Sequence, residues 1–255
     1  MPDFRFFPAL CCALRFLTVL PIPWAKARDG ALFTASVFAF PVVGLLIGLI
    51  GAVIAWLLYG VVPASVLAWF AVLYLSGISG FLHLDGLADS ADGLLSCRDR
   101  QKMMAIMKDS RSGSMAVAVL VLVILGKFAS IRPLADQETV VLPALILTPF
   151  IGRTAIVVTM AILPYARQDT GGIGGLFYSA AAKKSALVGL VLLAILGFLL
   201  HGLAFFPVVL LSLLVTFLFA RYCREKIGGA TGDTLGATCE LAELAALFAF
   251  SLTFS

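Results

Sequence analysis

The chain has 255 residues, of which 62% are hydrophobic and only 13% are charged. Because soluble domains carry about 25% charged residues, the composition excludes a separate soluble domain and indicates an all-α, polytopic integral membrane protein. The net charge of +4 comes from cations scattered through several loops, which argues against a nucleic-acid partner. We expect residues 1–255 to form a single membrane-embedded domain.

The first apolar run, residues 7–20, is too short to cross a bilayer and is interrupted by Arg15. We therefore expect a short N-terminal helix that lies in the membrane interface. Apolar segments of spanning length follow. The sequence predicts about seven transmembrane helices, at about residues 32–59, 61–81, 113–131, 140–163, 185–201, 203–220 and 241–255.

Basic residues fall almost entirely on one side of these spans. The N-terminal segment and the loops after the second, fourth and sixth spans hold 15 of the 18 lysines and arginines. Basic loops stay on the cytoplasmic side of a membrane. We therefore expect a multi-pass protein of the cell (inner) membrane, with its N-terminus and its motif-bearing loops facing the cytoplasm.

Three acids, Asp85, Asp89 and Asp92, fall within eight positions directly after the second span. A helix would put them on one face, where like charges repel unless a cation lies among them. Oxygen ligands without cysteine favour a hard divalent ion, so we expect Mg²⁺ with substrate phosphates completing its shell. The alternative is a solvated acidic helix end. His83 is a candidate general base in the same stretch, or only a hydrogen-bonding partner.

A second polar cluster occupies residues 228–243. Asp233 and Glu240 are seven residues apart and share a helix face, and Glu243 lies one turn further on, inside the last span. A glycine turn that caps a helix explains Asp233 alone. Acids inside a bilayer are costly and tend to mark function, so we expect all three acids to bind substrate. This requires the second, third and seventh spans to pack together.

The loop before the third span carries Lys108, Asp109 and Arg111. Asp109 could extend the metal site, and the two cations could hold phosphate. The alternative is ordinary cytoplasmic loop charge.

Three further positions are candidates for anion binding. Arg153 lies in the middle of the fourth span and should face the protein interior, where it needs an anion. Arg167 precedes a glycine-rich stretch that includes Gly174, whose backbone N–H groups could bind phosphate; a flexible connector is the alternative. Lys127, in contrast, is expected to extend to the far interface.

The polar motifs together resemble those of the membrane-bound cobalamin synthases, the adenosylcobinamide-GDP ribazoletransferases. The resemblance rests on LHLDGLADSADGL at 82–94, MKDSRSG at 107–113, GGATGDTLGATCELAEL at 228–244, RFLTVLPIP at 15–23, Gly152-Arg153, and the stretch from Arg167 to Phe177. It implies a Mg²⁺-dependent transferase in which α-ribazole, or its 5′-phosphate, displaces GMP from adenosylcobinamide-GDP to give adenosylcobalamin or its phosphate. The partners implied are these two substrates and the lipid bilayer. A homo-oligomer, or association with other cobalamin-assembly enzymes, stays open.

Two other functions compete with this interpretation. CDP-alcohol phosphotransferases also set spaced acids on membrane helices, but their DGxxAR signature is absent because Asp89 follows Asp85-Gly86-Leu87-Ala88. A cation-coupled transporter would need polar residues near the midplane of several spans, whereas here the acids cluster at one interface. Clustered acids with neighbouring cations fit the attack on a diphosphate better, because metal ions and cations neutralise its charge.

Overall fold

The computed structural model describes residues 6–23, 29–109, 111–166 and 180–253. In these residues the regular structure is helical, apart from one isolated bridge between Tyr165 and Ala230. The elements are α1 (Phe6–Leu17), α2 (Asp29–Ser36), η2 (Val37–Ala39), α3 (Phe40–Leu58), α4 (Ala64–Gly77), α5 (Leu82–Leu94), α6 (Arg100–Ile106), α7 (Ser114–Leu134), α8 (Glu138–Ile162), α9 (Ala180–His201), η4 (Gly202–Ala204), α10 (Phe205–Ile227) and α11 (Gly232–Thr253). The expected all-α membrane fold is confirmed.

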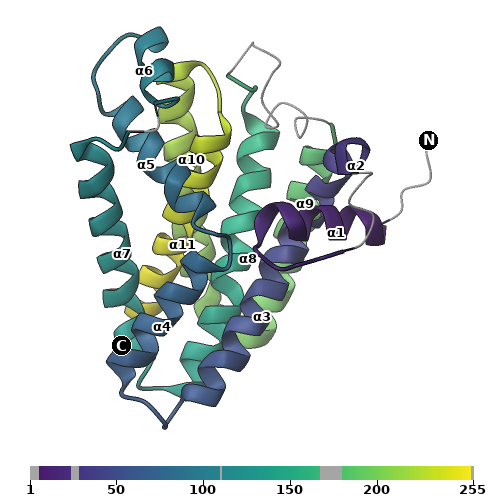
Figure 1. Ribbon diagram of the computed structural model, residues 1–255. Helices are drawn as coiled ribbons and strands as arrows, with labels where there is room; N and C mark the ends of the chain where they lie inside the picture. The colour runs from purple at the N-terminus through teal and green to yellow at the C-terminus, as the bar shows by residue number, and fades with distance from the viewer. Residues whose placement is uncertain (1–5, 24–28, 110, 167–179, 254–255) are drawn as a thin grey trace.

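Five helical segments of the described chain are long and apolar enough to cross a membrane, and the bent pair α4 and α5 makes up to six. The sequence predicts about seven. The difference arises because the expected fifth and sixth spans fall within one apolar segment, Ala181–Ile227, which holds α9 and α10. Between these helices Gly202 has a positive φ of 59°, so that the chain reverses direction (Figure 1).

Helices α8 and α11 form the centre of the bundle (Figure 1). Helix α8 packs against α3, α9 and α11, while α11 also packs against α5, α7 and α10. Glycines bring α3 and α8 into backbone contact: a Cβ on Gly44 would lie 2.4 Å from the Pro149 carbonyl oxygen, and one on Gly48 would lie 2.1 Å from that of Ile146. Small residues at such crossings are typical of helix packing in membranes.

The second apolar run is not one straight span. Helix α4 ends at Gly77, and the chain turns by 80° before α5 begins. Gly80 and Phe81 have φ values of 60° and 61°, a left-handed conformation that is unusual for a bulky residue such as Phe81. The acidic stretch that follows is therefore a helix inside the bundle, packed against α7 and α11.

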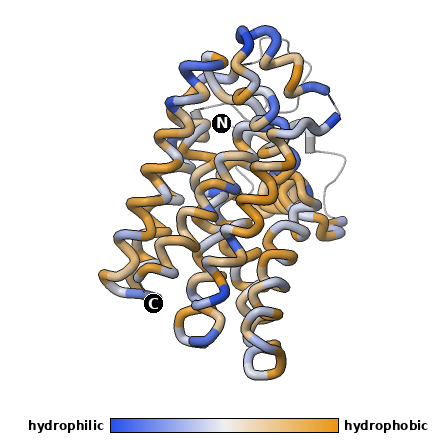
Figure 2. Tube along the Cα trace, turned by 90° about the vertical axis from the view of Figure 1, so that its left-hand side faces the viewer, coloured by the Kyte–Doolittle hydropathy of each residue, from blue (hydrophilic) through white to orange (hydrophobic). Residues whose placement is uncertain are grey.

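Helix α1 is the expected short apolar N-terminal helix and lies across the direction of the other helices (Figure 1). Polar residues gather at the end of the bundle where α6 lies, while the helices below are largely apolar (Figure 2). The described basic residues of α6 and of the last turn of α10 lie at this end, since these two elements are in contact.

Candidate active site

A cavity of about 150 Å³ lies where α1, α3, α5, α8 and α11 meet. The polar side chains that line it come from α5 and α11 and are His83, Asp85 and Asp233. The lining residues from α1, α3 and α8 are all apolar and comprise Phe16, Leu17, Phe40, Ile156 and Met160. The two acidic motifs, far apart in the sequence, therefore contribute to one cavity.

Glycines allow the backbones of α5 and α11 to approach closely beside this cavity. A Cβ on Gly86 would lie 2.7 Å from the Asp233 carbonyl oxygen, and a Cβ on Gly236 would lie 3.2 Å from the Cα of His83. Since α7 packs against both helices, the expectation that these segments pack together is confirmed.

Asp233 lies in the first turn of α11, which two threonines cap. Thr231 and Thr234 bond reciprocally: the Thr231 N–H donates to Thr234 Oγ1 at 2.8 Å, and the Thr234 N–H donates to Thr231 Oγ1 at 3.2 Å. This pattern satisfies N–H groups that the first helical turn leaves unpaired. The last span accordingly begins at Gly232 and not near residue 241. The expected start of this span near residue 241 was wrong, because the capped polar turn is part of the helix.

Helix α5 has the predicted common face, but its three acids have different surroundings. Asp85 is exposed and lines the cavity, while Asp89 is half-buried. Asp92 accepts hydrogen bonds from the backbone N–H groups of Gly113, at 2.5 Å, and Ala116, at 2.9 Å. These two groups open α7, so Asp92 caps that helix from another element.

Within the described residues, no three His, Cys, Asp or Glu side chains are placed to hold a metal ion by themselves. Magnesium is usually held by one or two carboxylates, with waters and substrate phosphates completing its shell. Asp85 and Asp233, which both line the cavity, match that smaller donor set.

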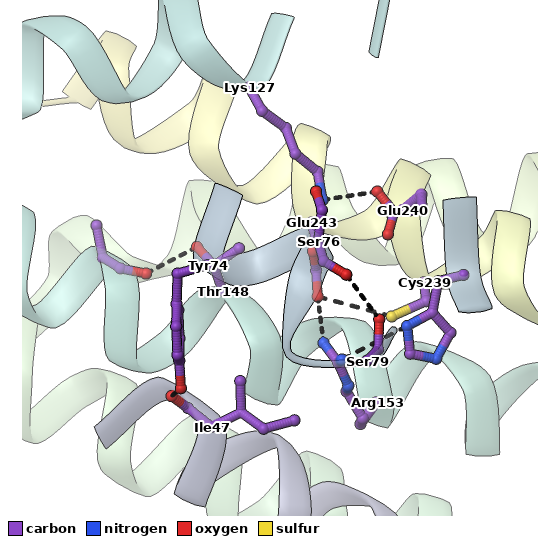
Figure 3. A network of polar contacts seen from close by, with 12 residues as sticks. Ile47, Tyr74, Ser76, Ser79, Lys127, Thr148, Arg153, Cys239, Glu240 and Glu243 are labelled. Carbon is purple, nitrogen blue, oxygen red and sulfur yellow. Dashed lines mark hydrogen bonds and ion pairs between the residues drawn. The ribbon is translucent and has the colours of Figure 1, made fainter. Parts of the chain in front are cut away.

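Behind the cavity, four charged side chains form a buried network (Figure 3). Lys127 Nζ lies 2.6 Å from Glu243 Oε2 and 2.8 Å from Glu240 Oε2, and Arg153 Nη1 donates to Glu243 Oε1 at 2.5 Å. Each of these side chains is at most 2% exposed.

This network changes the interpretation of its four members. Arg153 faces the interior and finds an anion as expected, but that anion is Glu243. Glu240 and Glu243 are partnered in the core and do not line the cavity. The expectation that Lys127 extends to the far interface was wrong, because its ammonium group is buried between the two glutamates.

The network reaches the cavity through His83. Arg153 Nη2 lies 3.5 Å from His83 Nδ1, and His83 is part of the cavity wall. The site thus has two layers, one facing the cavity and one charged layer behind it.

Comparison with known proteins identifies the family. A family model described as cobalamin-5-phosphate synthase matches residues 9–251. The chain belongs to the cobalamin-5-phosphate synthase family. It is 37% identical over 242 residues to the adenosylcobinamide-GDP ribazoletransferase of Thermoanaerobacter sp. (strain X514), covering 94% of this chain and 96% of the relative. The proteins of the same name from Citrobacter koseri and Escherichia coli (strain K12 / DH10B) are 37% and 35% identical. No solved structure matches the chain.

The loop before α7 contributes no described residue to the lining of the cavity. Arg111 is exposed and binds Asp109, Nη2 to Oδ2 at 2.6 Å. Hydrogen bonds from the Arg111 side chain lower the pKa of the Asp109 carboxyl to about 2. Lys108 is exposed. Arg167 and Gly174 lie outside the described residues.

The cavity residues that sequence reasoning missed are apolar. Phe16, Phe40, Ile156 and Met160 carry no distinguishing signal in a chain that is 62% hydrophobic. The one available signal was the stretch 15–23, which entered the family resemblance without a role. Its Phe16 stacks near Phe40, with 6.1 Å between ring centroids.

Proposed function

We propose that the chain is an adenosylcobinamide-GDP ribazoletransferase, which completes the attachment of the lower ligand of cobalamin. A ribose hydroxyl of α-ribazole, or of its 5′-phosphate, attacks the phosphorus nearer the cobinamide. A new P–O bond forms, the P–O bond to GMP breaks, and the hydroxyl proton is released. The name shared by the full-length relatives supports this reaction.

The observation that carries the proposal is a cavity lined by both carboxylates and aromatic side chains. Asp85 and Asp233 supply the carboxylates, and Phe16 and Phe40, with Met160, supply apolar side chains from other helices. The reaction joins a diphosphate to a nucleoside with a planar aromatic base. A diphosphate needs a metal ion to neutralise its charge, and carboxylates can hold such an ion. An aromatic base gains from burial against apolar and aromatic side chains.

We further propose that Mg²⁺ is the cofactor and that Asp85 and Asp233 hold it, with Asp89 one helical turn along α5. The ion would neutralise charge on the diphosphate and on the departing GMP. Asp92 was predicted as a third ligand, but its two oxygens already accept backbone hydrogen bonds. Binding of phosphate by Lys108, Arg111, Arg167 and Gly174 stays a prediction.

The proposed orientation places the cavity toward the cytoplasm. The cavity lies between the beginnings of α3 and α11 and the end of α8, toward the end of the bundle that carries α6 (Figure 1). Because basic residues concentrate at that end, the positive-inside rule supports a cytoplasmic site.

The test is release of GMP from adenosylcobinamide-GDP by the purified protein in lipid vesicles, with α-ribazole or its 5′-phosphate as acceptor. We expect release only with an acceptor and Mg²⁺, and its loss when EDTA removes the ion. Asp85→Asn should lower release at least about a hundredfold, while Asp136→Asn, in the exposed ion pair with Arg132, should retain it. Absence of release with either acceptor would overturn the proposed function. Full release in EDTA would overturn the proposed metal.

A further inference from the structure

The imidazole of His83 lies between the buried charge network and the cavity. Its Nδ1 faces Arg153 Nη2 at 3.5 Å, and the residue is 3% exposed while lining the cavity wall. No protein group in the described part of the chain bonds to its other ring nitrogen, Nε2. The two nitrogens therefore differ in their surroundings: Nδ1 faces Arg153, and Nε2 is left for a group outside the described residues.

The partner of Nδ1 determines which ring nitrogen carries the proton. A guanidinium group has five N–H donors and no acceptor, so it can only donate. Facing Arg153, Nδ1 must therefore offer its lone pair, and in a neutral imidazole the proton then lies on Nε2.

Arg153 cannot turn away from His83 without breaking its own contacts. Its Nη1 donates to Glu243 Oε1, and Glu243 Oε2 is held by Lys127. A Cβ on Gly152, the preceding residue, would lie 2.8 Å from Glu243 Cγ, so α8 and α11 are in close contact at this point. Contacts among α7, α8 and α11 thus fix the direction of the Arg153 guanidinium.

We propose that His83 is a hydrogen-bond donor to the substrate and not a general base. Arg153 is the positioning residue that holds the ring in its Nε2–H form, and Nε2–H donates into the cavity that Asp85 and Asp233 also line. The acceptor is a phosphate oxygen of the diphosphate, an assignment that rests on the proposed function. The donor binds an oxygen whose negative charge the two neighbouring carboxylates would otherwise repel.

The tautomer can be read without any activity. The chain has two histidines, so ¹⁵N-histidine labelling in lipid gives two ring spectra, and His201→Gln removes one of them. We expect His83 to show a protonated Nε2 and an unprotonated Nδ1. Arg153→Met should remove this preference for a protonated Nε2. Arg153→Lys keeps a buried cation beside Glu243 and should therefore keep the protein folded, so that its His83 spectrum can be compared. A protonated Nδ1 in the unsubstituted protein would overturn the proposal.

Substitutions at His83 test the donor role in the GMP-release assay. The side-chain amide of glutamine places an N–H close to the position of Nε2, whereas asparagine is too short to do so. We expect His83→Gln to retain activity within about threefold, and His83→Asn and His83→Ala to lose about tenfold or more, as for a lost hydrogen bond to a charged group. Equal loss in His83→Gln and His83→Ala would overturn the donor role. If the unsubstituted protein releases no GMP, the proposed function fails while the spectra still decide the tautomer.

Discussion

Lys127 on α7 meets Glu243 on α11 in the centre of the bundle, with 2.6 Å between Nζ and Oε2 and each side chain 1% exposed. The same ammonium group lies 2.8 Å from Glu240. Two cations and two carboxylates therefore balance in a region that excludes water. Such a set adds little net stability, but removing one member leaves an uncompensated buried charge.

Lys127→Met should therefore destabilise the protein strongly. Removing one partner of a buried ion pair costs about 3–5 kcal/mol, which corresponds to a fall of about 10 °C in the midpoint of thermal unfolding for a chain of this size. The measurement is thermal unfolding of the purified protein in detergent.

The matched control is Arg221→Met, which breaks an ion pair of similar length with Glu225, 2.8 Å, on the exposed surface of α10. Exposed pairs contribute about 0–1 kcal/mol, so the midpoint should stay nearly constant. Similar midpoints for the two variants would contradict the buried network.

Asp92 and Asp85 share a face of α5 but should respond differently to truncation. Asp92→Ala removes both acceptors for the first N–H groups of α7, and loss of such a cap costs about 1–2 kcal/mol. Asp85 is exposed on the cavity wall, so Asp85→Ala should leave stability within about 0.5 kcal/mol while lowering turnover roughly a hundredfold. Thermal unfolding and GMP release, measured on both variants, separate the two roles. A stable but inactive Asp92→Ala protein would instead support Asp92 as a metal ligand.

Gly86→Ala should separate the two halves of the site. The added methyl group would lie 2.7 Å from the Asp233 carbonyl oxygen, so α5 and α11 would have to move apart. A shift of about 1 Å in a reacting group costs roughly a hundredfold in rate. We expect that loss in the turnover of GMP release, measured per folded molecule.

Gly77→Ala on α4 is the matched control, because its Cβ would approach only Phe81 Cζ, at 4.0 Å. It should keep normal turnover. Normal turnover in Gly86→Ala as well would show that the reaction tolerates a wider separation of α5 and α11.

The orientation of the protein can be tested with its own cysteines. Cys97 is exposed in the α5–α6 loop, and the other cysteines are buried. A membrane-impermeant thiol reagent should label Cys97 only from the cytoplasmic side. In a Cys97→Ser background, Val61→Cys, at the opposite end of the bundle and 74% exposed in its native form, should be labelled only from outside. The reverse pattern would overturn the proposed topology.

Sequence patterns predicted the parts of the site that depend on local periodicity. The spacing of Asp85, Asp89 and Asp92 predicted their shared helix face, and the helix is present. Chemistry predicted that Arg153 would face inward toward an anion. The convergence of α5, α7 and α11 followed from the cost of acids near a bilayer, and these helices do pack together.

Tertiary pairing could not be predicted in the same way. Lys127 near the end of an apolar run is compatible with either an interface or a buried acid, and only the position of α11 decides between them. The left-handed backbone conformation of Phe81 also carries no sequence signal. The bend before α5 was therefore not predicted, and the second span was predicted as one straight helix. The capping role of Asp92 depends on a helix that begins after an intervening loop and α6.

The bend before α5 has a consequence for how the protein enters the membrane. Helix α4 has 14 residues and is therefore about 21 Å long, shorter than the hydrocarbon core of about 30 Å. It cannot span the bilayer alone, and α5, which continues it, carries three acids. The translocation machinery must therefore accept this segment before the partners of α5 have emerged from the ribosome.

Those partners are α7 and α11, and α11 follows the other described helices in the sequence. Asp233 is therefore synthesised long after the acids of α5. A nascent chain that ends before residue 232 holds α5 without the helix that buries it, so the site can form only after this residue has been made.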